Sequence, residues 1–369
     1  MRRRDVLAMA PAILAACRPK RGSGFAGYAF VANEEGQAVA AVDLTAFAVA
    51  RHIPLGSSPT EILAHPARTP VYAVNSRAGT LYEIRTWDLT LGRRVRVSTV
   101  VTAPRFAPSG EAIWMLCPEA RQLAAVSSDR FQPGSRIALP AVPGDLDISE
   151  DGQWAAVSFP APGMAALVNL STRRLERVLQ VGRTAGFARF RGDGKTLMVA
   201  NPKDRLLSIF DVPSGRLLVH LPLAVTPRQV CFKHDGGQCF ITGEGLDAVV
   251  TVYPFQTEVG ATTLAGRAPG SLAVSSSPDY LFVANPTTAD VTILNIQTQR
   301  VIAVAPVGRE PCHITITPDN QYALVLNRAS GDMAVIRIAA ITANRTKSAP
   351  LFTMIPVGSR PVSAVVRAV

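Results

Sequence analysis

The sequence of 369 residues has little charge, few aromatic side chains and none of the common catalytic patterns. Charged residues make up 18% of the chain, and Phe, Trp and Tyr together only 6%. The five histidines form no H-x-x-x-H pair, the five cysteines form no C-x-x-C, and no G-x-S-x-G is present. The usual sequence motifs of a zinc site, a redox dithiol, an attached c-type haem and a hydrolase nucleophile are therefore absent. No metal site and no cofactor is predicted.

The N-terminus contains an apolar segment, but it is too short to be a membrane-spanning helix. Val6 to Ala16 spans only 11 residues, whereas a helix needs about 20 to cross a bilayer. Arg2, Arg3 and Arg4 precede this run, which gives the charged and apolar regions of a signal peptide. Arg3 and Arg4 with Asp5-Val6-Leu7 resemble the twin-arginine export motif.

Leu14-Ala15-Ala16-Cys17 resembles the lipobox of bacterial lipoproteins, and this resemblance implies that Cys17 carries a lipid anchor. The sequence then divides into a signal peptide at 1–17, a basic tether at 18–24 and a single domain at 25–369. We expect an extracytoplasmic protein, periplasmic or at the cell surface, that is lipid-anchored to a membrane of the bacterial envelope. An uncleaved tail or an ordinary secretory signal is the alternative.

The formal charge of +11 is divided between the N-terminal segment and the domain. Removing residues 1–16 takes away three arginines and one aspartate, which leaves +9. Arg18, Lys20 and Arg21 lie in the tether, so the domain itself carries a diffuse +6. Diffuse positive charge gives weak, salt-sensitive attraction to anionic surfaces. A nucleic-acid partner is therefore not favoured.

What the sequence does contain is a repeat of 42 residues. Asn33, Asn75, Asn201, Asn285 and Asn327 fall on one 42-residue spacing, and each ends an apolar run such as "FVAN", "YAVN" or "ALVLN". A second series at the same spacing passes through Pro59, Pro143, Pro227, Pro269 and Pro311. Two series with one period indicate a repeat architecture.

Each repeat reads as four short β-strands. Between 269 and 306 these are "GSLAVSS", "DYLFVAN", "ADVTILNI" and "RVIAVAPV", separated by turn residues. Alternating Val, Ile and Leu with Pro, Asp, Asn and Gly between them are typical of antiparallel strands. Four strands repeated every 42 residues predict an all-β propeller of four-stranded antiparallel blades.

The segments "SPDYLFVAN", "DVTILNIQTQRVIAVAPVG" and "TPDNQYALVLN" resemble the YVTN-repeat family of bacterial β-propellers. Seven blades begin near the proline series, and three N-terminal strands and one C-terminal strand remain, at about 28–33, 38–43, 47–54 and 361–367. Together these form an eighth blade that closes the ring by pairing the two chain ends. A seven-bladed ring is the alternative.

In propellers the strand after each proline lies innermost, so alternate residues of that strand face the central channel. We expect a ring of polar side chains there, which is the default place for a ligand. Simple solvation of the channel is the alternative. The candidate ligand-binding residues are Glu61, Arg105, Asp145, Asp147, Arg189, Gln229 and His313.

Cys231 and Cys239 lie symmetrically about Asp235, at the centre of a predicted hairpin. Placed opposite each other, they would form a cross-strand disulfide in an oxidising compartment. Two free buried thiols are the alternative.

The sequence favours a non-catalytic extracytoplasmic lipoprotein that acts as a scaffold or binds an unidentified protein or small molecule. Its membrane contact is the lipid anchor on Cys17. The family resemblance leaves two other functions open. One is an enzyme with its site in the channel, either a lactonase-like hydrolase or a tetrapyrrole binder of the cytochrome d1 type. The other is single-stranded nucleic-acid binding, for which Arg93, Arg94 and Arg96 near Trp87 are the candidate cluster.

Overall fold

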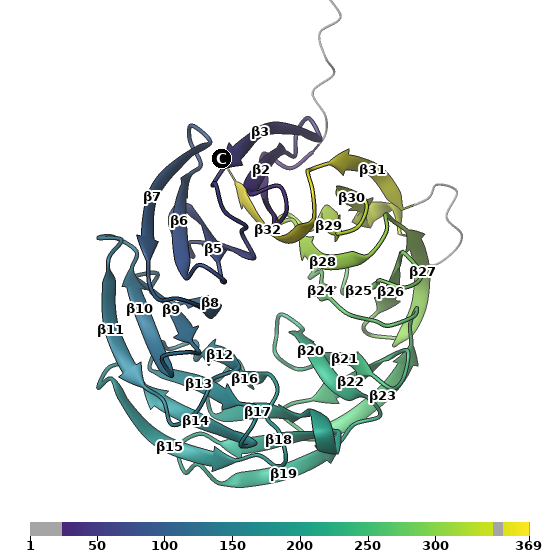
Figure 1. Ribbon diagram of the computed structural model, residues 1–369. Helices are drawn as coiled ribbons and strands as arrows, with labels where there is room; N and C mark the ends of the chain where they lie inside the picture. The colour runs from purple at the N-terminus through teal and green to yellow at the C-terminus, as the bar shows by residue number, and fades with distance from the viewer. Residues whose placement is uncertain (1–23, 342–349, 369) are drawn as a thin grey trace, which may run out of the picture.

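The computed structural model describes residues 24–341 and 350–368, and within them the fold is entirely β apart from two short 3-10 turns. Eight sheets of four antiparallel strands are present. Figure 1 shows the sheets arranged around one axis, like the blades of a propeller. The prediction of eight blades is confirmed, and the seven-bladed alternative is wrong.

We number the blades in chain order. Blade 1 contains β1 (Gly27–Asn33), β2 (Ala38–Asp43), β3 (Ala48–Pro54) and β32 (Pro361–Ala368). Blade 2 contains β4 (Glu61–Ala64), β5 (Val71–Asn75), β6 (Thr80–Arg85) and β7 (Thr90–Arg96). Blade 3 contains β8 (Thr102–Phe106), β9 (Ala112–Cys117), β10 (Gln122–Ser127) and β11 (Pro133–Ala138). Blade 4 contains β12 (Asp145–Ile148), β13 (Trp154–Phe159), β14 (Met164–Asn169) and β15 (Arg174–Gln180).

Blade 5 contains β16 (Ala188–Phe190), β17 (Thr196–Asn201), β18 (Leu206–Asp211) and β19 (Leu217–Pro222). Blade 6 contains β20 (Thr226–Phe232), β21 (Cys239–Glu244), β22 (Ala248–Tyr253) and β23 (Glu258–Leu264). Blade 7 contains β24 (Leu272–Val274), β25 (Tyr280–Asn285), β26 (Asp290–Asn295) and β27 (Arg300–Pro306). Blade 8 contains β28 (Pro311–Ile316), β29 (Tyr322–Asn327), β30 (Asp332–Arg337) and β31 (Leu351–Pro356). The 3-10 turns are η1 (Pro202–Asp204) and η2 (Ile338–Ala340).

Burial changes from the inside to the outside of each blade. In blades 2 to 8 the first strand lies at the channel and the last at the rim, whereas in blade 1 β32 lies at the channel and β3 at the rim (Figure 1). The two middle strands are almost wholly buried, as in β5 and β25, because both of their faces pack against neighbouring blades. The rim strand β15, "RLERVLQ", exposes most of its residues. The inner strand β12, "DLDI", buries Leu146 fully and leaves Asp145 and Asp147 half-buried.

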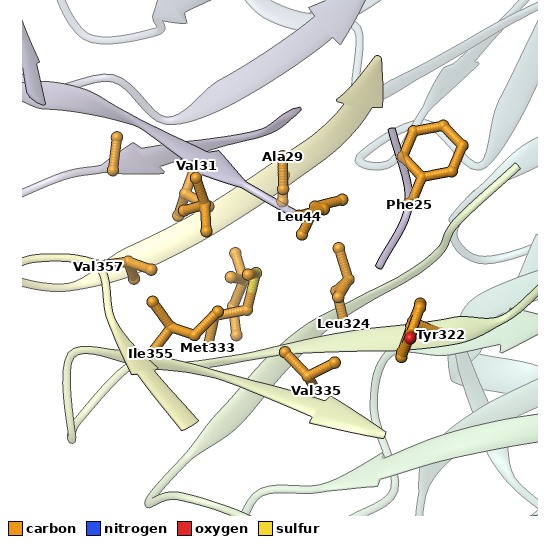
Figure 2. Packing of buried hydrophobic residues seen from close by; sticks show 14 residues of the cluster. Phe25, Ala29, Val31, Leu44, Tyr322, Leu324, Met333, Val335, Ile355 and Val357 are labelled. Carbon is orange, nitrogen blue, oxygen red and sulfur yellow. The ribbon is translucent and has the colours of Figure 1, made fainter. Parts of the chain in front are cut away.

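The ring closes through blade 1, as the leftover strands predicted. β32 pairs antiparallel with β1 in a register that runs from Gly27 opposite Ala368 to Asn33 opposite Pro361. Figure 2 shows the contact between blades 1 and 8, where Ala29, Val31 and Leu44 face Leu324 and Met333. Burying these side chains stabilises the ring only if both chain ends are present.

The repeated Gly and Asn have a structural role. Asn33 ends β1 and its side-chain Nδ2 donates a 2.8 Å hydrogen bond to the carbonyl of Val357, in the loop that enters the blade. A Cβ on Gly358 of that loop would stand 2.9 Å from the same Nδ2, and Gly308 has the same relation to Asn327 at 2.8 Å. The Gly-x-x-Pro loop therefore begins with glycine because the buried Asn needs that space.

The predicted disulfide between Cys231 and Cys239 is wrong. Both thiols are free. The hairpin pairs Cys231 with Phe240 and Phe232 with Cys239, so its centre lies half a residue away from Asp235. A shift of one residue sends the two side chains to opposite faces of the sheet. Cys239 accordingly packs against blade 5, and Cys231 against blade 7.

The signal peptide, the twin-arginine pair Arg3 and Arg4, the lipobox cysteine Cys17 and nearly all of the basic tether lie outside the described residues. Among the residues that the structure describes, no helix is long and apolar enough to cross a membrane.

Candidate functional site

All seven predicted channel residues lie on innermost strands. Each projects from the first strand of its blade, and together they come from six of the eight blades. Their positions are Glu61 on β4, Arg105 on β8, Asp145 and Asp147 on β12, Arg189 on β16, Gln229 on β20 and His313 on β28.

Asp145 links two blades. Its Oδ2 accepts a hydrogen bond of 3.1 Å from the backbone N–H of Ala188 in the next blade. The same oxygen forms a close ion pair with Nη1 of Arg189, and both side chains are about one-fifth exposed. Its own N–H donates to Ser158 Oγ at 3.1 Å. Charge-assisted bonds of this kind are stronger than neutral ones.

The bond from Asp145 belongs to a series. Side-chain oxygens at the inner strands accept a backbone N–H of the next blade, which lies 43 residues further on except at the closure of the ring. Asp147 accepts from Phe190 at 2.9 Å. Ser271 accepts from Ile314 at 3.1 Å, and Ser363 of the closing strand accepts from Ile62 at 3.3 Å. These N–H groups belong to inner strands and have no partner strand on the channel side, so the side-chain oxygen of the neighbouring blade satisfies them. The bonds thereby join neighbouring blades at the channel.

The channel wall divides into two halves. We call the inner strands of blades 2 to 5 the charged arc, because they carry Glu61, Arg105, Asp145, Asp147 and Arg189. We call the inner strands of blades 6, 7, 8 and 1 the neutral arc, because they are uncharged at the positions that match these five residues, although β20 also carries Arg228 and β32 carries Arg367. Its corresponding positions hold Gln229, Ser271, His313 and Ser363.

A pocket of about 310 Å³ lies where the charged arc meets the neutral arc. This volume is at the lower end of the range for small-molecule sites. Two arginines and one carboxylate line it, together with an amide and a hydroxyl. The lining includes Asp145, Arg189, Arg228, Gln229, Ser158 and Phe187.

Only three of the seven predicted residues therefore share this pocket. Glu61, Arg105, Asp147 and His313 do not line it. His313 has its Nε2 within 3.1 Å of the carbonyl of Ala364, on the neighbouring strand β32. Arg105 donates to the carbonyl of Pro104 at 3.0 Å. The seven predicted residues therefore line the channel wall, and three of them line this pocket.

Burial in the channel wall changes the protonation of three groups. It raises the pKa of Glu61 to about 7, against the opposing effect of Arg105 and with a contribution from Asp145. It also raises the pKa of Asp147, although Arg189 and the bond from Phe190 act in the opposite direction. Burial lowers the pKa of His313, so this imidazole is held neutral.

Arg228 is the pocket residue that sequence reasoning missed. Its side chain is more than half exposed and pairs with Glu244 at 2.8 Å. The sequence did contain a signal for Arg228. It directly follows Pro227, and the residue at this position of the repeat is uncharged in the other blades. Those residues are Thr60, Thr102, Gly144, Gly186, Gly270, Cys312 and Val362.

Within residues 24–341 and 350–368, no group of three or more His, Cys, Asp and Glu side chains is arranged to hold a metal ion. Asp145 and Asp147 are instead bonded to backbone N–H groups of the next blade, and Asp145 also to Arg189.

Comparison with known proteins gives a family match and a sequence relative. Residues 180–350 match the family model described as "Lactonase, 7-bladed beta-propeller". A curated relative is the "Uncharacterized WD repeat-containing protein sll1491" of Synechocystis sp. (strain ATCC 27184 / PCC 6803 / Kazusa), 35% identical over 106 residues, which are 27% of this chain. The match spans 28% of the length of that relative.

Solved structures show the same fold at low identity. The dihydro-heme d1 dehydrogenase NirN, in complex with DHE, has a TM-score of 0.79 at 12% identity, over 94% of this chain and 77% of its own. The hydrazine synthase of Kuenenia stuttgartiensis has a TM-score of 0.61 at 18% identity, over 77% and 96%. A functionally unknown protein from Desulfotomaculum acetoxidans DSM 771 has 0.62 at 11%, over 80% and 98%.

The fold and these matches define a class: the chain is a β-propeller repeat protein. The matching family model describes seven blades, whereas this chain has eight.

Proposed function

We propose that this chain is an extracytoplasmic, lipid-anchored propeller of the YVTN-repeat kind that binds a small carboxylate-bearing molecule and performs no catalysis. The observation that supports this proposal is the pocket at the junction of the two arcs, which Arg189, Arg228 and Gln229 line together. Asp145 pairs with Arg189 and Glu244 with Arg228, but each guanidinium has five N–H donors, more than one carboxylate uses. Two guanidinium groups and an amide in a lining of about 310 Å³ therefore suit a carboxylate better than an apolar ligand.

The arrangement of Arg189 supports binding. Asp145 pairs with Nη1 of Arg189, and the same Nη1 donates to the carbonyl of Ala188 at 2.6 Å. These two contacts fix the orientation of the guanidinium before a ligand arrives. A fixed donor loses little conformational entropy on binding. Arg228 is held less tightly, because its partner Glu244 is exposed.

The same contacts argue against hydrolysis in this pocket. A general base has to reach the proton that it abstracts. The carboxylate of Asp145 is already occupied by the N–H of Ala188 and by Arg189. His313 belongs to blade 8 and bonds to Ala364, away from the pocket lining.

Calorimetric titration with citrate, malate, succinate and glutamate tests the proposal. We expect at least one of them to bind with a Kd below about 1 mM. Arg228→Met should weaken this binding at least about tenfold without changing the melting temperature, because Arg228 bonds to no inner strand. Arg216→Met, at the exposed β18–β19 hairpin, is the matched control and should bind like the wild type. Failure of all four acids to bind, or an unaltered Arg228→Met, would contradict the proposal.

Lactone hydrolysis is a second candidate, and two observations favour it. Residues 180–350 match a lactonase family model. The pKa of Glu61 is raised to about 7, which suits a general acid or base at neutral pH. A lactone panel separates the candidates: activity that is lost in Glu61→Gln and retained in Arg228→Met would favour the enzyme. Wild-type protein without lactonase activity favours the binding function.

A tetrapyrrole in the channel fits the inner strands poorly. NirN is in complex with DHE in its solved structure, but its 12% identity carries over the fold alone. Arg105 and Arg189, which would face acidic groups of the ring, are bonded to Pro104 and Asp145. We therefore derive no chemistry through such a group.

Anchoring depends on Cys17, which follows the apolar run of the signal sequence. We expect the mature protein to sediment with membranes and to gain the mass of a lipid at this cysteine. Cys17→Ser should release it into the soluble fraction, whereas replacing Arg3 and Arg4 with lysine should leave unprocessed precursor in the cytoplasm. A Cys17→Ser variant that stays with the membranes would contradict the anchor.

A further inference from the structure

Trp87 is the large apolar side chain most exposed to solvent among the described residues. It lies in the turn between β6 and β7 and is 75% exposed, whereas Trp114 is buried at 7%. The guanidinium carbon of Arg85 lies 5.3 Å from the centre of the Trp87 ring, so the ring is braced by a cation–π contact. An exposed tryptophan held in place is informative, because a large apolar surface is normally buried.

A pocket of about 420 Å³ opens beside this ring, at the outer side of blade 2 and away from the channel. Thr69, Pro70, Glu83, and Gly92 and Arg93 of β7 line it together with Trp87. A Cβ on Gly92 would stand 3.1 Å from Oε2 of Glu83. The absence of a side chain at Gly92 therefore leaves space next to the carboxylate of Glu83, which lines the pocket.

Glu83 and Arg93 form a planar pair of charged groups in the lining of this pocket. Glu83 is 8% exposed, and Arg93 bonds to both of its oxygens, from Nε at 2.7 Å and from Nη2 at 2.5 Å. Nη1 of Arg93 donates to the carbonyl of Asp129 at 2.7 Å, which fixes the guanidinium from the other side. The Arg93 bonds hold the pKa of Glu83 below its usual value, so the carboxylate is ionised at neutral pH.

An aromatic platform beside a fixed carboxylate–guanidinium pair has a specific chemical complement. A pyranose ring has an apolar C–H face that stacks on an indole, and its edge presents adjacent hydroxyls. Each hydroxyl both donates and accepts, so a carboxylate oxygen and a guanidinium N–H can bind neighbouring hydroxyls together. We propose that this pocket is a saccharide-binding site in which Trp87 stacks on a pyranose ring while Glu83 and Arg93 bind its hydroxyls.

The charges of the pocket disfavour single-stranded nucleic acid as the occupant. Stacking of bases on Trp87 would need unpaired cations for the phosphates. Arg93 is paired with Glu83, and Arg85 lies 3.2 Å from Asp88. Both arginines of the lining are therefore paired, and Arg94 and Arg96, the other members of the candidate cluster, do not line the pocket, which suits an uncharged sugar. This site is independent of the carboxylate pocket at the channel.

Phe255 provides a matched control. It lies 168 residues after Trp87, which is four repeats of 42, and occupies the corresponding turn in blade 6. It is 49% exposed and Arg191 stacks on it at 4.4 Å, yet it lines none of the described pockets. Replacing it with alanine removes an exposed, arginine-stacked ring without touching the proposed site.

The test is calorimetric titration of the full chain with cellotetraose, maltotetraose and N-acetylchitotetraose. We expect at least one to bind with a Kd between about 10 µM and 1 mM and with little dependence on salt. Trp87→Ala should weaken this binding at least about tenfold, while Phe255→Ala binds like the wild type. Both variants should melt with the wild type, because both rings are exposed.

Three results would overturn the inference. The first is the absence of binding by all three oligosaccharides at about 10 mM. The second is unchanged binding in Trp87→Ala. The third is salt-sensitive retention of oligo-dT that is lost in Trp87→Ala, since this would show that the platform serves nucleic acid.

Discussion

The charged and neutral arcs solve one architectural problem with different side chains. At matching positions 126 residues apart, Asp145 accepts the N–H of Ala188 and Ser271 accepts the N–H of Ile314, both at 3.1 Å. Ser363 does the same for Ile62 at the closing blade. A serine hydroxyl is thus sufficient to join two blades at the channel. Joining the blades therefore does not require the negative charge of Asp145. This carboxylate lines the pocket together with Arg189.

This difference separates structural from functional polarity in a repeat protein. A side chain whose task recurs in every blade is explained by the architecture, as for Asn33 and Asn327 beside their glycines. A side chain that performs the common task with additional charge needs another explanation. The neutral arc therefore serves as an internal reference for the charged arc.

We expect the largest change in melting temperature from removing β32, the strand of the neutral arc that closes the ring. Truncation after Arg360 removes β32, which pairs with β1 over seven residues of that strand and supplies Ser363 and Ala364 to the wall. We expect the melting temperature to fall by more than about 10 °C, because the apolar contact between blades 1 and 8 loses its closing strand.

Differential scanning calorimetry measures this effect, and a synthetic peptide of residues 361–369 added in trans should restore part of the stability. An unchanged melting temperature of the truncated chain would contradict closure by the two chain ends.

A smaller effect concerns pH and the charged arc. Burial raises the pKa of Glu61 from the ordinary 4.5 to about 7 in the folded chain, so the folded state holds a proton that the unfolded state loses within this interval. The stabilising contribution is complete below about pH 4.5 and is lost as the pH rises through 7. Glu61→Gln should therefore melt about 3 °C higher than the wild type at pH 8. At pH 4 the two proteins should melt at the same temperature.

Thermal melts between pH 4 and 8 check this sign. Glu176→Gln on the exposed rim strand β15 is the control and should follow the wild type across the range. A lower melting temperature of Glu61→Gln at pH 8 would contradict burial as the cause.

The sequence predicted the fold in detail because the 42-residue period repeats the same packing problem eight times. Proline positions located the inner strands, and the alternation within them located Asp145, Arg189 and Gln229. The sequence could not tell which of these residues share a pocket, because that depends on contacts between blades. Arg189 reaches Asp145 in the preceding blade, and His313 reaches Ala364 in the following one. The disulfide failed for a local reason, a hairpin centre displaced by half a residue.

The most direct test transplants the neutral arc into the charged arc. Asp145→Ser with Arg189→Thr copies Ser271 and Thr315 from the equivalent positions 126 residues further on. We predict that this double variant melts within about 3 °C of the wild type and no longer binds any carboxylate of the titration panel. An unfolded double variant would show that the charges hold the ring together, and unaltered binding would show that the ligand site lies elsewhere.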